Sequence, residues 1–414
     1  MKSVDEHLAD VLEHVEPLPA FAQHLLDAHG HHLAQDVHSP RDLPLFDNSA
    51  MDGYAVRLQE VESAGEDKPV VLPISQELPA GAAGWAELEP GTCARIMTGA
   101  PVPPGADAIV PVEWTDGAAE GEVSITRAPE PGQHIRRRGD DIRAGQMLLT
   151  AGTLLGPRQL GLLAGAGIEL AVVHPRPRVV VISTGSELVE PGTEPGPGQI
   201  PDANSFVLSS AARAAGATVY RVGVVPDDGA LLLETIEDQL IRADLVITSG
   251  GVSVGAYDVV KEVMSGLGTV TFDQVAMQPG KPQGFGVIGE DRIPIFTLPG
   301  NPVSAYVSFE LFVRPVLRRL MGYQNLHRET AELICMETFD SPAGRAQYIR
   351  GKIDPPEHGR SYTVSPVGGH GSHLLGGLAQ ADCLICVPAD KTRVSAGDTL
   401  TVILLEQPEG RVER

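Results

Sequence analysis

The sequence predicts a multidomain protein of α/β and β type, built around a doubly wound, mostly parallel α/β sheet. The chain has 414 residues, more than one hydrophobic core usually serves. Apolar runs at 178–183 and 244–248 alternate with helical segments, as expected of parallel strands that are covered on both faces. Before and after this region the pattern changes to short β-branched runs separated by Gly and Pro, which predicts β-rich domains.

The N-terminal part is predicted to begin with a helix. Ser3 and Glu6 have the spacing of a capping box, and apolar residues then recur at helical intervals. A second helix is expected at about 20–28, ending at Gly30. The β-rich pattern follows from about residue 46, and a further helix is expected around 157–166.

The α/β region is the easiest to interpret. Helices are expected at about 205–215, 229–243 and 257–266, between apolar strands, and a further strand is expected at 293–299. This strand leads into a long helix, because Asn301 is a favourable N-cap and Pro302 suits the first helical position.

Beyond about residue 322 the pattern is β again, through the four runs 330–338, 346–353, 361–364 and 399–405. Cys383 and Cys386 form a Cys-x-x-Cys pair within another apolar run that reads as a strand. Residues three apart in a strand face opposite sides, so this pair cannot share a metal. We therefore predict buried thiols here, not a zinc or redox site.

The overall charge argues against two classes of partner. Lys and Arg total 31 against 54 Asp and Glu, which gives a net charge of −23. Such a chain repels a phosphate backbone and an anionic lipid surface, so we expect neither nucleic acid nor membrane as a partner. The N-terminus is polar and acidic and no apolar run approaches membrane-spanning length, so a cytoplasmic location is expected.

Several loops have the composition of a ligand site. Residues 43–55 hold two carboxylates, an amide and a hydroxyl between apolar flanks, which suits either a well-formed turn or a polar ligand. Glycine-rich loops follow three predicted strands, at 183–187, 248–255 and 298–301. Ligands of open α/β sheets bind at this edge, and glycines let a backbone approach a phosphate closely. None of the loops is a dinucleotide or Walker fingerprint.

Charged residues crowd the same region. Each carboxylate alone is most often a helix cap or a solvated charge, but together with a phosphate cradle they suit Mg²⁺. The carboxylates concerned are Glu187, Asp202, Asp227, Asp228 and Asp258. Lys281, Arg350 and Ser372 have the positive charge and hydroxyl that a tetrahedral oxyanion requires.

Four segments, 43–55, 95–107, 248–255 and 298–304, resemble the molybdopterin molybdenumtransferase family, which includes the gephyrin E domain. The resemblance runs from about Glu6 to the C-terminus. It implies an elongated, helix-containing N-terminal domain, a β-rich inserted domain, the α/β molybdopterin-binding domain and a C-terminal β-barrel-like domain. The corresponding residues are 1–45 with 134–173, 46–133, 174–325 and 326–414.

The resemblance also implies the reaction: Mg²⁺-dependent insertion of molybdate, the substrate, into adenylylated molybdopterin with release of AMP. Carried onto this chain, the catalytic residues are Asp52, Thr98, Asp141, Glu187, Asp228 and Asp258, of which Glu187, Asp228 and Asp258 hold the metal. The substrate-binding residues are Ser249, Gly250, Gly251, Ser253, Pro299, Gly300, Asn301, Pro302, Lys281, Ser304, Arg350 and Ser372. Gln278 stands where some members carry a second lysine.

Family members are homodimers with a shared cleft, so Asp52 and Thr98 are expected to face the sheet of the partner subunit. A molybdopterin adenylyltransferase, and molybdoenzyme apoproteins or chaperones, are further partners that the resemblance suggests. Two other functions stay open. The chain could be the adenylyltransferase itself, although the additional domains and the segment 47–53 oppose this. It could also be a gephyrin-like scaffold, although it lacks the long linker and fused domain of such a protein.

Overall fold

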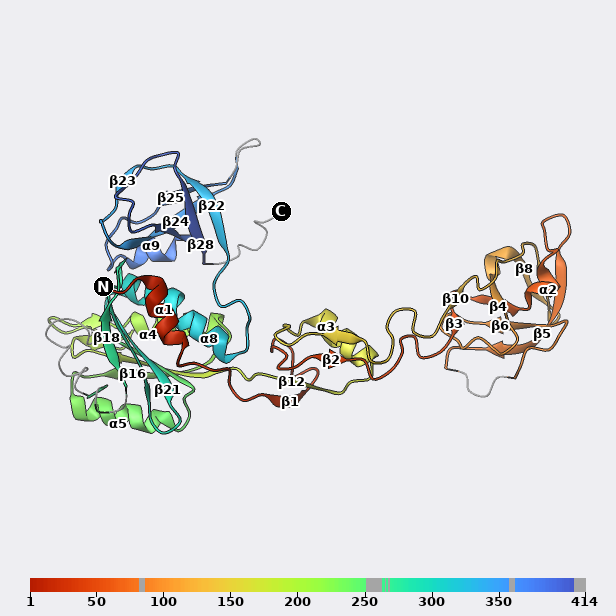
Figure 1. The fold of residues 1–414 in the computed structure, drawn as a ribbon, viewed down its shortest axis with the longest axis horizontal. Helices are drawn as coiled ribbons and strands as arrows, with labels where there is room; N and C mark the ends of the chain where they lie inside the picture. Colours follow the sequence, from red (N-terminus) through yellow and green to blue (C-terminus); the bar gives the residue numbers. More distant parts are fainter. Residues whose placement is uncertain (82–85, 251–262, 265, 267–268, 357–361, 406–414) are drawn as a thin grey trace. The chain divides into compact units, whose positions relative to one another are not determined.

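The computed structural model describes residues 1–81, 86–250, 263–264, 266, 269–356 and 362–405 (Figure 1). The chain divides into two compact units. One comprises Met1–Phe21 and Val173–Arg414, and the other comprises Ala22–Val172. The division into four domains stays a prediction.

The first unit contains the predicted α/β sheet. Its six strands lie in the order β16 (Thr218–Val225), β13 (Arg178–Thr184), β17 (Leu245–Ser249), β21 (Ile293–Leu298), β20 (Pro282–Ile288) and β18 (Thr271–Gln274). The first four strands are parallel, and β20 and β18 run antiparallel to their neighbours. The doubly wound, mostly parallel sheet is therefore confirmed.

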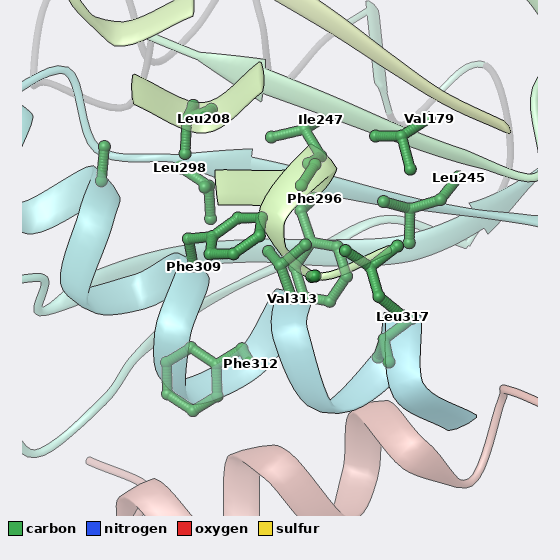
Figure 2. Close-up of a cluster of buried hydrophobic side chains, with 14 of the residues drawn as sticks. Val179, Leu208, Leu245, Ile247, Phe296, Leu298, Phe309, Phe312, Val313 and Leu317 are labelled. Carbon is green, nitrogen blue, oxygen red and sulfur yellow. The ribbon is translucent and has the colours of Figure 1, made fainter. Parts of the chain in front are cut away.

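Helices cover both faces of this sheet. On one face, α4 (Asn204–Ala214) and the continuous helical run α7 (Pro302–Ser308), η2 (Phe309–Val313) and α8 (Arg314–Leu320) enclose the larger core, part of which Figure 2 shows. On the other face, Leu232 and Ile236 of α5 (Gly229–Leu240) contact the alternate residues of the same strands. Burial on both faces explains why the strands are apolar throughout. Within the described residues, no helix has both the length and the apolar character needed to span a bilayer.

Two helix starts agree with their sequence signals. In α1 (Val4–Leu12), the Ser3 N–H donates to Glu6 Oε2 at 2.7 Å and the Glu6 N–H donates to Ser3 Oγ at 3.1 Å, so the capping box is formed. The helix α7 begins at Pro302 as predicted, but the Asn301 side chain makes no capping hydrogen bond. The helix expected at 257–266 falls largely outside the described residues.

A closed barrel follows the long helix. Its strands are β24 (Ala346–Asp354), β25 (Thr363–Pro366), β22 (Thr330–Cys335), β28 (Thr399–Leu404) and β26 (Cys383–Val387), and β26 pairs back with β24. A short strand, β19 (Met277–Gln278), adds to the outer edge of β24 in parallel. The predicted barrel-like C-terminal fold is thus confirmed. Burial raises the pKa of the Cys383 and Cys386 thiols in β26 to about 12; Cys383 is buried as predicted, and Cys386 is partly exposed.

The second unit contains the predicted β-rich segment. Its six-stranded sheet has the order β7 (Ala108–Pro111), β4 (Gly53–Val56), β6 (Cys93–Ile96), β5 (Val70–Leu78), β9 (Glu122–Ile125) and β8 (Thr115–Ala119). The helix expected around 157–166 is α3, Pro157–Gly165. Short two-stranded ladders complete the unit, among them β3 (Asn48–Ser49) with β10 (Ile135–Arg136) and β2 (Val37–His38) with β11 (Met147–Leu149).

The helix expected at about 20–28 is wrong. Phe21–His24 forms the strand β1, which pairs with β12 (Leu170–Val173), and the chain then turns before Gly30. The Leu25 N–H continues the contact by donating to the Glu169 carbonyl at 3.3 Å. Pairing with a segment almost 150 residues further along the chain, as the residue numbers show, outweighs a weak local helical preference.

Candidate active site

The loops after three parallel strands meet at the carboxyl edge of the α/β sheet. The Gly250 N–H donates to the Leu298 carbonyl at 3.2 Å, which joins the loops after β17 and β21. Gly250 has φ +104°, and a Cβ atom at this position would lie 2.2 Å from the Thr184 carbonyl oxygen. Only glycine permits this close approach of two backbones. The convergence predicted from the glycine-rich loops therefore holds for their described residues.

Asn204, at the start of α4, ties two of these loops together. Its Nδ2 donates to Ser249 Oγ at 2.8 Å and to the Gly300 carbonyl at 2.6 Å. The sequence alone does not indicate this role, although Asn204 lies in the polar segment that follows β14 (Leu188–Val189) and β15 (Ile200–Pro201). Its role depends on a contact across almost one hundred residues, which no local pattern reveals.

Asp202 has a structural role. Its side chain is 1% exposed. Its Oδ1 accepts from Ser183 Oγ at 3.0 Å, and its Oδ2 accepts from Ser205 Oγ at 2.5 Å. Both oxygens accept hydrogen bonds within the protein, so this carboxylate joins the end of β13 to α4.

Of the three residues predicted to hold the metal ion, Glu187 and Asp228 are described, and they lie on adjoining loops. The Ser186 N–H donates to Asp227 Oδ2 at 3.2 Å, and this bond joins the loops that carry Glu187 and Asp228. Glu187 is exposed and lies over Gly185. Asp228 is the N-cap of α5, where its Oδ1 accepts from the N–H groups of Ala230 and Leu231 at 2.9 and 3.1 Å. Asp228 thus has the capping role that a loop aspartate most often has.

The remaining residues predicted for this edge, Gly251, Ser253 and Asp258, lie outside the described residues. In the part that is described, no group of three or more His, Cys, Asp or Glu side chains could hold a metal ion. Pro299 and Gly300 follow β21, and a Cβ atom added at Gly300 would lie 3.7 Å from the Gly250 Cα.

The residues predicted to bind the oxyanion include Arg350, which lies in strand β24. Its side chain is only 2% exposed. One of its terminal nitrogens donates to the Leu374 carbonyl at 2.6 Å and the other donates to the Gly369 carbonyl. Burial lowers the pKa of Arg350, but a guanidinium keeps its charge in a protein. The described part of the chain offers it no ion pair, and three of its five N–H donors are not used by these two bonds.

Arg350 lines a pocket at the junction of the barrel and the α/β domain. The other lining residues are Gln278, Pro279, Val303, Gln347, Tyr348, Ile349, Gly369 and His370. Next to it, the Val303 N–H donates to the Ser372 carbonyl at 3.0 Å, which brings the loop of Ser372 to the helical turn of Ser304. Lys281 is half-buried and lies two residues beyond Pro279. Of the four residues predicted for the oxyanion, Arg350 lines this pocket, and Ser304, Ser372 and Lys281 lie on segments that adjoin its lining residues.

The second unit joins two of its predicted residues directly. Asp52 Oδ1 accepts from the Thr98 N–H at 2.6 Å and from Thr98 Oγ1 at 2.8 Å. Both side chains are exposed. Asp141 is also exposed, and its N–H donates to the carbonyl of Leu43, at the start of the same 43–55 segment. Asp47 serves the turn itself by accepting from Arg137 and Arg138.

Protein-family models match three successive stretches of the chain. Residues 2–167 match the MoeA N-terminal region (domain I and II), residues 180–319 match a probable molybdopterin binding domain, and residues 332–405 match the MoeA C-terminal region (domain IV). The fold and these matches define the class: a multidomain protein with MoeA regions on either side of an α/β domain of molybdopterin-binding type.

Named relatives match over almost the whole chain. Molybdopterin molybdenumtransferase 2 of Mycobacterium tuberculosis is 46% identical over 408 residues, covering 97% of this chain and 99% of that protein. The molybdopterin molybdenumtransferase of Haemophilus influenzae is 36% identical, covering 97% and 98%. A solved MoeA structure from Pyrococcus horikosii has a TM-score of 0.85 at 32% identity, covering 98% and 99%. The chain belongs to the molybdopterin molybdenumtransferase family and is a transferase.

Proposed function

We propose that this chain inserts molybdenum from molybdate into adenylylated molybdopterin, in a reaction that requires Mg²⁺ and releases AMP. The names of the relatives support molybdenum transfer to molybdopterin in the biosynthesis of the molybdenum cofactor. The observation that carries the finer proposal is the buried guanidinium of Arg350, which lines a pocket and has no acidic partner in the described part of the chain.

The pocket suits an oxyanion because a buried charge without an opposite charge is costly. Arg350 donates to two carbonyls, which hold it in place but do not neutralise it. An oxyanion in the pocket would accept charge-assisted hydrogen bonds from the remaining donors. Ser304, Ser372 and Lys281 lie on segments that adjoin the lining residues, and we propose that they add hydroxyl groups and a further positive charge.

The edge of the α/β sheet suits the phosphate groups of the adenylylated substrate. Ser249 ends β17 and Gly250 follows it, while Gly300 follows β21 close to Gly250. Closely spaced backbone N–H groups and a hydroxyl at the carboxyl edge of a parallel sheet are the usual parts of a phosphate cradle. These groups support the binding of a phosphate group in general. The pterin part of the substrate is inferred from the family.

The donor set near this edge fits Mg²⁺. This ion is bound by one or two carboxylates, with water and substrate phosphate oxygens as the other ligands. Glu187 offers an exposed carboxylate with no hydrogen bond in the described part of the chain, and Asp228, on the adjoining loop, has an Oδ2 that is not used to cap α5. We assign Asp258 the same role on the basis of the family resemblance. When bound there, Mg²⁺ would neutralise charge on the phosphate oxygens.

We also propose that the chain is a homodimer in which Asp52 and Thr98 of one subunit face the α/β sheet of the partner subunit. The two residues form an exposed, hydrogen-bonded pair in the second unit, away from any cradle of their own. An adenylyltransferase would supply the substrate, and a molybdoenzyme apoprotein or chaperone would take up the product.

One experiment tests the proposed reaction. The purified protein is incubated with adenylylated molybdopterin, Mg²⁺ and molybdate, and AMP is measured with each component omitted in turn. AMP release that needs both Mg²⁺ and molybdate supports the proposal. Adenylylation of molybdopterin from ATP, without need of molybdate, would instead indicate an adenylyltransferase, and absence of either reaction would favour a scaffold.

A further inference from the structure

A buried glutamine holds the turn that carries Lys281. Gln283, in β20, is 1% exposed. Its Nε2 donates to the Gly280 carbonyl at 2.5 Å and to Ser308 Oγ at 2.6 Å. The reverse orientation of the amide would set its oxygen against the carbonyl oxygen of Gly280, so the NH₂ group must face the turn.

Both peptide units next to Lys281 are held by hydrogen bonds. The Gly280 carbonyl belongs to the peptide unit before Lys281, and Gln283 binds it. The carbonyl of Lys281 belongs to the unit after it and accepts from the Val275 N–H at 2.8 Å. Because the two planar units that meet at the Lys281 Cα are both held, these two bonds set the direction in which its side chain leaves the turn.

One helix supports both this turn and a second residue predicted for the oxyanion. Ser304 and Ser308 are buried and lie four positions apart in α7, so they share one face of the helix. Gly280 packs directly on this face, since a Cβ atom at Gly280 would lie 2.8 Å from Ser308 Oγ. Gln283 therefore ties the turn of Lys281 to the helix of Ser304.

Gln283 is not the residue that stability alone would favour at this position. Its Oε1 is buried and has no hydrogen-bond partner in the described part of the chain. A buried acceptor without a donor costs free energy, and nearly all buried polar groups avoid this. The two N–H donors of the same amide serve the turn and the helix. The contribution of this side chain is therefore to be sought in the position of the turn.

We propose that Gln283 is a positioning residue for the oxyanion site, one that sets the place of Lys281. The proposal rests on the function proposed above, in which Lys281 helps to bind molybdate. Gln278 and Pro279 of the same turn line the pocket that also holds the guanidinium of Arg350. Lys281 is the only cation of this turn, so its placement decides whether the turn brings positive charge to the pocket.

The test compares two variants. Gln283→Met keeps the length of the side chain and removes both donors, whereas Ser308→Ala removes the partner on the helix and leaves the bond to Gly280. Ser39→Ala is the matched control. The buried Ser39 also donates from its side chain to a loop carbonyl, that of Arg41 at 2.6 Å, but it lies in the second unit.

Three quantities are measured for each protein: the melting temperature, the hydrogen exchange of amides 275–282, and the molybdate concentration for half-maximal AMP release at saturating adenylylated molybdopterin. In Gln283→Met we expect faster exchange and a half-saturating molybdate concentration raised about threefold to tenfold, the range that loss of a neutral hydrogen bond gives. Ser308→Ala should show smaller changes in the same direction. Half-saturation by adenylylated molybdopterin should not change, and Ser39→Ala should match the wild type in exchange and in molybdate dependence.

A double variant shows whether the effect passes through Lys281. Gln283→Met should add little to the effect of Lys281→Ala on molybdate, because Gln283 acts through this lysine. Additive losses would overturn the inference, as would wild-type exchange or an unchanged half-saturating molybdate concentration in Gln283→Met. If Gln283→Met does not fold, Ser308→Ala decides by the same measurements. Absence of AMP release by the wild type would contradict the proposed function, and the exchange data would still decide whether Gln283 fixes the turn.

Discussion

Asp52 accepts two hydrogen bonds from Thr98, at 2.6 Å from its backbone N–H and at 2.8 Å from its hydroxyl. The two residues stand on separate motifs, 46 positions apart. The bonds hold the pKa of Asp52 below its usual range, the backbone bond more than the hydroxyl bond. A carboxylate with a lowered pKa stabilises the fold above its unfolded pKa, and this contribution is lost as the pH falls through the folded value.

Thr98→Val should therefore raise the pKa of Asp52 part of the way to its ordinary value, because the backbone bond stays and only the hydroxyl bond is lost. Thr98→Ser keeps the hydroxyl and serves as the control. The measurement is an NMR titration of the Asp52 carboxyl group. Identical titration curves for the wild type and Thr98→Val would show that the hydroxyl does not bind this carboxylate in solution.

Removal of the positive charge of Lys281 or Arg350 should selectively weaken the binding of molybdate. A hydrogen bond to a charged group contributes roughly 1.5–3 kcal/mol, and about 1.4 kcal/mol is a tenfold change in affinity, so Lys281→Ala and Arg350→Ala should each raise the half-saturating molybdate concentration about tenfold or more. Binding of adenylylated molybdopterin should change less. Titration of molybdate at saturating adenylylated molybdopterin measures this difference.

The two variants should differ in stability. Arg350→Ala also leaves the Leu374 and Gly369 carbonyls without their donor, so its melting temperature should fall. Lys281 has no ion pair in the described part of the chain, so Lys281→Ala should melt normally. Arg393→Ala, at an exposed ion pair with Asp340, is the charge-matched control. Equal molybdate curves for Lys281→Ala and Arg393→Ala would place the oxyanion elsewhere.

Glu187→Gln should largely abolish Mg²⁺-dependent AMP release and leave the melting curve unchanged. The side chain is exposed and makes no hydrogen bond in the described part of the chain, so its charge contributes little to stability. AMP release is measured against Mg²⁺ concentration, because a lost metal ligand should shift the whole curve to higher Mg²⁺. Wild-type turnover at low Mg²⁺ would remove Glu187 from the metal site.

Asp228 allows its two roles to be separated. Asp228→Ala removes the cap of α5, which should lower the free energy of unfolding by about 0.5–2 kcal/mol. Asp228→Asn retains a capping oxygen and removes the charge, so it should melt close to the wild type yet lose Mg²⁺-dependent AMP release. Denaturant unfolding and AMP assays test both variants. Full activity in a stable Asp228→Asn would leave Asp228 as a cap alone.

The parts of the fold that follow from local pattern could be predicted. The strands around Val180 and Val246 are apolar because both faces are covered, and Ser3 with Glu6 forms the capping box that their spacing indicates. The strand Phe21–His24 could not be predicted, because its partner lies at the other end of the second unit. The same applies to the site. Asn204 looks ordinary in sequence, and its significance comes from its hydrogen bonds to Ser249 and Gly300, which are distant in the chain.

Ring closure of the barrel has a consequence for the oxyanion pocket. Strand β24 is held by β26 along residues 347–351 and by β25 along residues 351–354, so neither side of it can slide freely. A slip of one position would move the side chain of Arg350 to the opposite face of the strand. Closure of the barrel therefore fixes the register of β24. The position of the guanidinium depends on all five strands, and not on the pocket alone.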